Sequence, residues 1–245
     1  GASAGALLNE DNRADNVRHT FNAGIGKWVS AYDIYFKDNR TNVDIYGYYP
    51  MGDPENVSEY GFEVKKDQST SSVDGKPGGY EASDFLWAKA ADVAPTDKVI
   101  TLSFRHMMAS ARVTLEEGTG FAEGEWPLLD KSVLMINTIR KASIDLSTGV
   151  VTPEGDVEST GTIPCFVNND FCSIVVPQTV PAGTPLISIT VDGTPYVFSK
   201  DEDFTYNPSK QHNFTITVSK KTGSGYEFLL SSESITAWEN DSMSH

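Results

Sequence analysis

The chain has few of the residues that catalytic and metal sites require. Cysteine occurs twice and histidine four times in 245 residues. No histidine lies in an HExxH or a CxxC…HxxxH pattern, so no zinc site is indicated. The sequence also lacks a G-x-S-x-G motif and a phosphate-binding glycine loop. We therefore expect no catalytic residues, no metal ligands and no cofactor, and we predict that the protein is not an enzyme.

Positive charge and long apolar runs are also scarce. The chain has 34 acidic against 19 basic residues, a net charge of −15. Nucleic acids and anionic membrane surfaces need a cationic face, so we expect neither as a partner. No apolar run approaches the ~18 residues that span a bilayer. No signal peptide begins the sequence, so we expect either a cytosolic protein or one whose targeting segment has been removed or is not included in this sequence.

Helical periodicity is nearly absent, and alternation of apolar and polar residues dominates. Short strands are separated by turn residues about every ten positions, as is typical of all-β sandwiches. We predict strands at 43–49, 213–218 and 226–230, and hairpins over 143–152 and 186–198, the latter around Asp192–Gly193. We expect a surface loop over Gln68–Gly79. Ser83–Ala91 predicts a short helical turn or a packed loop.

The alternation reverses within one predicted strand. Leu102 and Phe104 occupy even positions, whereas Ala109, Ala111 and Val113 occupy odd ones. The reversal falls at His106–Met107–Met108. Neighbours on a strand point to opposite sides, so these three side chains make a poor soft-metal site.

We instead interpret His106, Met107 and Met108 as a packing switch between two domains. A strand that reverses its buried side needs a bulge or must leave one sheet for another, and methionine fills the irregular gaps there. We expect His106 to bond a neighbouring backbone group. With the polar segment 92–98, this predicts domains at 1–98 and 99–245.

The two cysteines frame a predicted hairpin. If Asn168–Asn169 form a two-residue turn, Cys165 faces Cys172 across the strands. The two sulfurs would then be close enough for a disulfide. A pair of free thiols in a half-buried hairpin is the alternative.

The tryptophans are spread along the chain instead of clustering as a sugar-binding surface would require. Trp126 lies in a Gly/Glu-rich loop and is the best candidate for an exposed contact. We nevertheless expect it to lie over the sandwich. Trp238 is predicted to anchor the last strand in the core.

Several segments in order resemble a known family. They are Y-G-Y-Y-P (46–50), E-A-S-D-F-L-W-A-K-A (81–90), L-S-F-R-H-M-M-A-S-A-R-V (102–113), A-S-I-D-L-S-T-G-V-V-T (142–152), I-V-V-P-Q-T-V-P-A-G (174–183) and I-T-A-W (235–238). Their joint order and spacing resembles the fimbrillin-like family of Bacteroidetes surface proteins, whose subunits are called type V pilins. The resemblance covers most of the chain from about Lys27 onward.

This resemblance implies two tandem transthyretin-like, Greek-key β-sandwich domains. It also implies export as a lipoprotein to the cell surface, trimming at a basic residue near the N-terminus, and assembly with other fimbrial subunits by strand donation. Arg13 and Arg18 are the candidate trimming sites. The lipobox cysteine and the family's first strand or strands are absent from this chain, so any membrane contact would be through a lipid anchor that this chain lacks.

Function is therefore expected to reside in contacts between molecules. We predict that the first domain, residues 1–98, is an incomplete sandwich that offers a groove, and that a neighbour donates a terminal strand, for example from Gly225–Trp238. Host or bacterial surface ligands are further expected partners. The alternative is a glycan- or host-ligand-binding module that stands alone or at a fimbrial tip.

Overall fold

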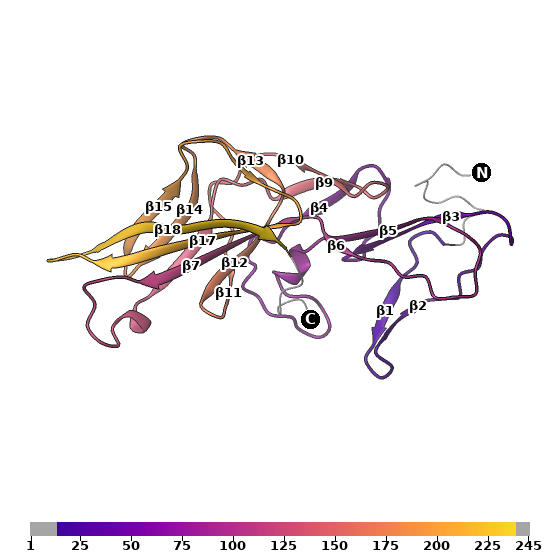
Figure 1. The fold of residues 1–245 in the computed structure, drawn as a ribbon, viewed down its shortest axis with the longest axis horizontal. Coiled ribbons are helices and arrows are strands. Elements are labelled where there is room, and N and C mark those ends of the chain that lie inside the picture. The colour runs from indigo at the N-terminus through magenta and orange to yellow at the C-terminus, as the bar shows by residue number, and fades with distance from the viewer. Residues whose placement is uncertain (1–13, 239–245) are drawn as a thin grey trace. The chain divides into compact units, whose positions relative to one another are not determined.

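The computed structural model describes residues 14–238, and these form an all-β protein (Figure 1). Two short 3₁₀ helices, η1 (Glu81–Ser83) and η2 (Trp126–Leu128), interrupt the strands. The strands are β1 (His19–Asn22), β2 (Lys27–Ser30), β3 (Val43–Tyr49), β4 (Tyr60–Glu63), β5 (Leu86–Val93), β6 (Arg105–His106), β7 (Ala109–Glu117), β8 (Lys131–Met135), β9 (Lys141–Asp145), β10 (Val150–Glu154), β11 (Cys165–Val167), β12 (Asp170–Val175), β13 (Gln178–Val180), β14 (Pro185–Val191), β15 (Thr194–Ser199), β16 (Phe204–Tyr206), β17 (Lys210–Lys220) and β18 (Tyr226–Ala237). No helix among the described residues is long and apolar enough to cross a membrane.

The described chain divides into two compact units. The first takes residues 14–61, 86–105 and 144–150, and the second takes residues 62–85, 106–143 and 151–238. Each unit is thus assembled from separate segments of the chain. A single boundary at residue 98 between tandem domains stays a prediction.

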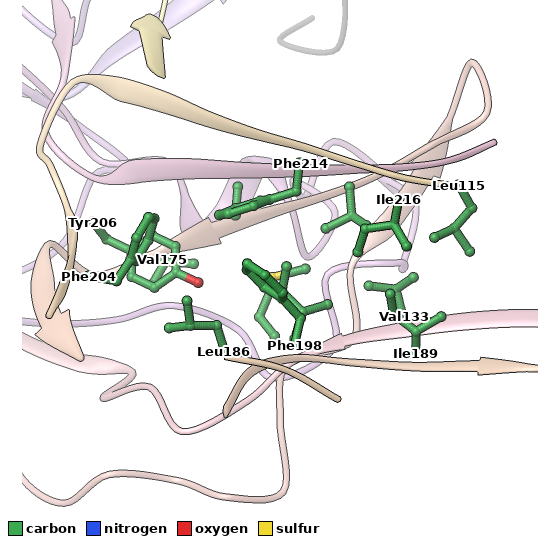
Figure 2. Close-up of a cluster of buried hydrophobic side chains, with 14 of the residues drawn as sticks. Leu115, Val133, Val175, Leu186, Ile189, Phe198, Phe204, Tyr206, Phe214 and Ile216 are labelled. Carbon is green, nitrogen blue, oxygen red and sulfur yellow. The ribbon is translucent and has the colours of Figure 1, made fainter. Parts of the chain in front are cut away.

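The second unit is a β-sandwich. One layer is a five-stranded sheet in the order β11-β12-β7-β17-β18, and the facing strands form the sheets β15-β14-β8 and β13-β16. In Figure 2, Phe214 and Ile216 point from one layer towards Leu186, Ile189 and Phe198 of the other. Alternate residues of β7 and β17 are buried in this core, as the alternation in the sequence predicts.

Turns and hairpins of this unit form where the sequence predicts them. Asp192 and Gly193 link β14 to β15, and both have positive φ angles, 47° and 79°. A two-residue turn of this kind matches the twist of antiparallel strands.

The five-stranded sheet also contains a parallel pair, in which Gln211 of β17 lies opposite Ser110 of β7.

The first unit has a much smaller core. Its buried apolar residues are Trp87, Ala88, Ile144 and Leu146. Its sheets are the hairpin β1-β2 and the strands β3 and β5, with β6 beyond β5. Its exposed large apolar residues are Phe21, Ile25, Trp28, Val29, Tyr32, Ile34, Tyr35, Met51, Val99, Phe104 and Val150.

One local prediction from the sequence is wrong. Most of Ser83–Ala91 is strand β5, which pairs with β3, instead of a helical turn or loop. Trp87 and Ala88 are adjacent and both buried, so the stretch shows no alternation from which to recognise a strand. The surface loop predicted at Gln68–Gly79 is present, since residues 69–77 are exposed, and only Gln68, Gly78 and Gly79 at its ends are buried.

The chain changes sheets where the alternation reverses. Strand β6 follows β5 in one sheet, whereas β7 is central to the five-stranded sheet. Met107 and Met108 lie between these strands and are buried, at 7% and 0% exposure. The predicted exchange of sheets is therefore present, while its role in packing between domains stays a prediction.

Candidate functional site

The first unit presents an apolar surface beside strand β3. Strand β3 pairs with β5. A Cβ atom added to Gly47 of β3 would come within 2.7 Å of the Phe104 ring and 3.1 Å of Leu102. The segment that carries Leu102 and Phe104 thus lies directly against β3, although Phe104 remains 47% exposed. Val99, earlier in that segment, is 94% exposed.

The opposite side of β3 is held by its tyrosines. The Tyr48 hydroxyl lies 2.6 Å from Oδ1 of Asn16 and 2.9 Å from the Gly52 carbonyl oxygen. Burial raises the pKa of Tyr48 to about 12. The Tyr48 ring packs 5.6 Å from that of Tyr60. These contacts fix β3 on one face.

The hairpin β1–β2 adds exposed aromatic side chains to this unit. The rings of Phe21 and Trp28 meet edge to face at 5.7 Å, yet they are 52% and 61% exposed. A two-stranded hairpin with so little burial is marginally stable by itself. The sequence favours Trp126, in its Gly/Glu-rich loop, as the best candidate for an exposed contact instead. Nothing in the sequence distinguishes Trp28 from a core tryptophan, because the alternation around it is ordinary.

An open sheet edge belongs to the other unit. Among the described residues, strand β18 ends the five-stranded sheet and is paired with β17 from Tyr226 to Ala237. Its charged residues are Glu227 and Glu233, and it contains no lysine, arginine or proline, which commonly protect sheet edges from further pairing. Leu229 and Ile235 on this strand are 64% and 52% exposed.

Trp126 and Trp238 are packed as the sequence predicts. Trp126 is half-buried against the core, 5.4 Å from the Phe121 ring, with Lys131 Nζ 4.3 Å from its ring centre. Trp238 is buried and stacks on the His106 ring at a centroid distance of 4.0 Å. Neither tryptophan is therefore presented to a ligand.

His106 bonds a side chain and not a backbone group. Its Nδ1 lies 2.9 Å from Oδ1 of Asp84, and both side chains are nearly buried. The prediction of a backbone partner is therefore wrong. Asp84 follows the helix η1, and the sequence does not indicate that this segment lies beside His106. Within residues 14–238, no group of three or more His, Cys, Asp or Glu side chains could hold a metal ion.

The cysteine hairpin has the register predicted from its turn. Asn168 and Asn169 have φ angles of 53° and 71°, and Cys165 pairs directly with Cys172. The thiols are unbonded in this structure.

Of the candidate trimming sites, Arg18 is exposed just before β1, and its backbone carbonyl accepts a hydrogen bond from Ala31 N. Arg13 lies outside the described residues.

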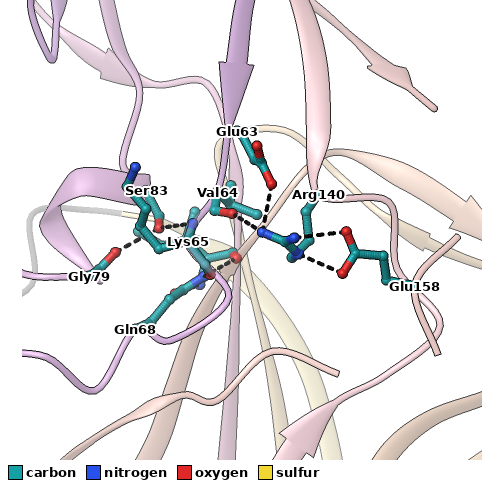
Figure 3. A network of polar contacts seen from close by, with 9 residues as sticks. Glu63, Val64, Lys65, Gln68, Gly79, Ser83, Arg140 and Glu158 are labelled. Carbon is teal, nitrogen blue, oxygen red and sulfur yellow. Dashed lines mark hydrogen bonds and ion pairs between the residues drawn. The ribbon is translucent and has the colours of Figure 1, made fainter. Parts of the chain in front are cut away.

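An arginine joins three segments of the second unit (Figure 3). Arg140 donates two hydrogen bonds to the Glu158 carboxylate, at 3.0 and 2.8 Å. Its Nη1 also lies 3.0 Å from the Val64 carbonyl oxygen and 2.9 Å from Glu63 Oε1. These bonds lower the pKa of Glu158 and raise that of Arg140. Sequence patterns gave no indication of Arg140, because its partners come from distant segments.

The Gln68 side chain pairs with the backbone of β12 at Ile174, a residue that β11 does not reach. Its side-chain amide donates to the Ile174 carbonyl at 2.8 Å, and its Oε1 accepts from Ile174 N at 2.7 Å. Strand β11 cannot do this, because Ile163 just before it pairs with the backbone of Lys66 and Gln68 instead. The Gln68 side chain therefore substitutes for a strand at that point of β12.

His212 is a second buried histidine, and it gives the fold a dependence on acid. Its Nε2 accepts a 2.9 Å hydrogen bond from Asn207 N, and Phe204 and Tyr206 pack against its ring. Burial lowers its pKa from 6.5 to about 4, against the opposing attraction of Glu233. Between these two values the unfolded chain holds the proton and the folded chain does not.

We predict that this histidine's contribution is complete above pH 6.5 and is lost as the pH falls towards 4. In His212→Gln, the side-chain oxygen can still accept from Asn207 N but does not titrate. The difference in unfolding free energy between the unaltered protein and the variant is expected to shrink by about 2 kcal/mol from pH 7.5 to pH 4. Urea unfolding at both pH values measures it, with exposed His19→Gln as the control. A constant difference would refute the prediction.

The chain is similar to known proteins over nearly its whole length. A family model described as fimbrillin-like matches residues 2–238. A comparison with curated proteins finds no match. A solved structure from Bacteroides uniformis, ascribed to cell adhesion, is 19% identical with a TM-score of 0.69, covering 95% of this chain and 89% of its own.

Two further solved structures come from Bacteroides ovatus. One, ascribed to cell adhesion, is 15% identical with a TM-score of 0.59 and covers 96% of this chain and 85% of its own. The other, a fimbrial protein, is 16% identical with a TM-score of 0.50 and covers 89% of this chain and 43% of its own. At these identities the structures establish a shared fold. The match of the family model over residues 2–238 goes further, and the chain belongs to the fimbrillin-like family.

Proposed function

We propose that this protein is a non-enzymatic fimbrial subunit or adhesin of the cell surface whose partners are other fimbrial subunits. Membership of the fimbrillin-like family supports this, and so do the names of similar structures, which refer to fimbriae and cell adhesion. The protein would act through contacts between molecules.

Assembly would proceed by addition of a β-strand to the first unit. The observation that carries this is the exposed apolar surface of the first unit, which has a small buried core and leaves Val99 and Phe104 94% and 47% exposed. An added strand would bond through its backbone to the unit while its alternate side chains cover these apolar side chains. Repetition from subunit to subunit gives an open filament.

The donor strand is the less defined part of the proposal. The region Gly225–Trp238 contains β18, which pairs with β17 along its whole length. A neighbour could donate this strand only after releasing it from β17. Trimming at Arg13 or Arg18 would act before β1, at the N-terminal side of the acceptor unit.

We predict that acidic substitutions on the acceptor surface prevent assembly. In a Val99→Asp, Phe104→Asp variant, the added strand would have to desolvate two carboxylates instead of burying two apolar side chains. Each apolar burial contributes roughly 1.5–3 kcal/mol, so the oligomeric fraction should fall at least about tenfold. Protein trimmed at its N-terminus, verified by N-terminal sequencing, would be concentrated and analysed as ladders on unheated gels and by electron microscopy.

Leu128→Asp is the matched control, because Leu128 is 84% exposed on η2 of the second unit. It should assemble like the unaltered protein. Ladders from the Val99, Phe104 variant would contradict the proposed acceptor surface. Trimmed protein that stays monomeric but binds glycans on an array would favour the alternative function, a ligand-binding module.

A further inference from the structure

The hairpin of β11 and β12 places two thiols opposite each other. Cys165 pairs directly with Cys172, and side chains of directly opposed residues project to the same face of a sheet. The Sγ of Cys165 lies 3.2 Å from the Cys172 carbonyl oxygen. Directly opposed residues have Cα atoms roughly 4.5–5.5 Å apart, within the range that disulfides span.

The pair lies on the sheet face that points away from the core cluster. Cys172 pairs with Arg112 of β7, whereas its neighbour Ser173 pairs with Ala111, a core residue. Cys165 and Arg112 thus flank Cys172 on one face. The hydrogen bond from Cys165 and the charge of Arg112 lower the pKa of Cys172, which favours its thiolate.

The position of the pair gives a bond between them a structural effect. Cys165 is the first residue of β11, an edge strand of three residues. The residues just before Cys165 do not pair with β12, because Ile163 pairs with the Lys66–Gln68 backbone instead. Beyond Cys172, Ile174 is bonded by the Gln68 side chain. Cys165 and Cys172 therefore stand at the fork where β11 separates from β12.

We propose that Cys165 and Cys172 form a cross-strand disulfide that links the edge strand β11 covalently to its neighbour β12. The oxidant is a low-molecular-weight disulfide such as oxidised glutathione. Cys165, the half-buried thiol, attacks it as the thiolate, which breaks the oxidant's S–S bond and releases one glutathione thiolate. Cys172 then attacks the Cys165 sulfur and releases the second. Two electrons pass to the oxidant, and the two protons from the cysteines end on the two glutathione thiols.

The purified full chain, first reduced and then incubated with oxidised glutathione, provides the test. We expect a monomer with a mass two hydrogens lower and no thiol open to alkylation after unfolding. Its melting temperature should rise by about 5 °C, since a short closed loop still restricts the unfolded chain. Dithiothreitol should reverse both changes.

Cys165→Ser is the control variant, because Cys165 is only half-buried and the change is small. It should show no rise in melting temperature on oxidation. Four results would overturn the proposal: thiols that remain free, glutathione adducts on either cysteine, cross-linked dimers, or a melting temperature that does not rise on oxidation. Each is distinguished by intact mass and by calorimetry.

Discussion

Replacing Arg140 by methionine is expected to lower the free energy of unfolding by about 2 kcal/mol. The arginine side chain is 13% exposed and is the shared partner of Glu63 and Glu158. Methionine keeps most of the buried length but removes the guanidinium from both carboxylates and the donor from the Val64 carbonyl (Figure 3). Water screens Glu63 and Glu158, which are 44% and 33% exposed, so we expect less than the loss for a fully buried ion pair.

Chemical denaturation measures this loss, and two variants show its origin. Arg140→Lys retains the charge but not the paired donors to Glu158, so its loss should be intermediate. Arg40→Met, at an exposed arginine, should change stability by less than about 0.5 kcal/mol. Equal losses for Arg140→Lys and Arg140→Met would show that the stabilisation comes from the paired guanidinium hydrogen bonds and not from the charge. No loss in either variant would contradict a role for the network in stability.

Gln68→Leu is expected to destabilise the protein by about 3 kcal/mol. The two side chains are similar in size, but leucine leaves both the N–H and the C=O of Ile174 unpaired. Gln68 has no exposed surface and spans 106 residues of sequence to reach that backbone. Each buried polar group left without a partner costs roughly 1–3 kcal/mol.

Gln68→Glu separates hydrogen bonding from packing. The carboxylate can accept from Ile174 N, but it places a second acceptor against the Ile174 carbonyl, so the loss should equal or exceed that of leucine. The half-buried Gln211→Leu on β17 is the control and should lose less than about 1 kcal/mol. Urea unfolding with a constant slope would measure all three variants. A Gln68→Leu protein as stable as the unaltered one would contradict the argument.

The parts of the fold that follow from local pattern could be predicted from the sequence. The alternation of Phe214, Ile216 and Val218 indicates a half-buried strand, and Asp192–Gly193 fixes the hairpin beside it. The reversal at His106 predicts a change of sheet because the period of side-chain direction in a strand is two. In each case the cause lies within a few residues.

The features that could not be predicted from the sequence depend on contacts between distant segments. Strand β5 was missed because Trp87 and Ala88 are both buried, which removes the alternation. Gln68 looked like the start of a polar loop, and its burial depends on where β11 leaves β12. The exposed surface at Phe104 and Trp28 could not be distinguished from core, because an aromatic residue on a strand has the same pattern whether or not another layer covers it.

The parallel pairing of β7 with β17 also constrains when the protein can fold. Ser110 lies opposite Gln211, so the middle of the five-stranded sheet joins segments roughly 100 residues apart. Closing so large a loop costs entropy before any of the pairing is gained. During synthesis, the second unit would remain incomplete until β17 has emerged. Almost the whole chain must therefore be available before the middle of this sheet can close.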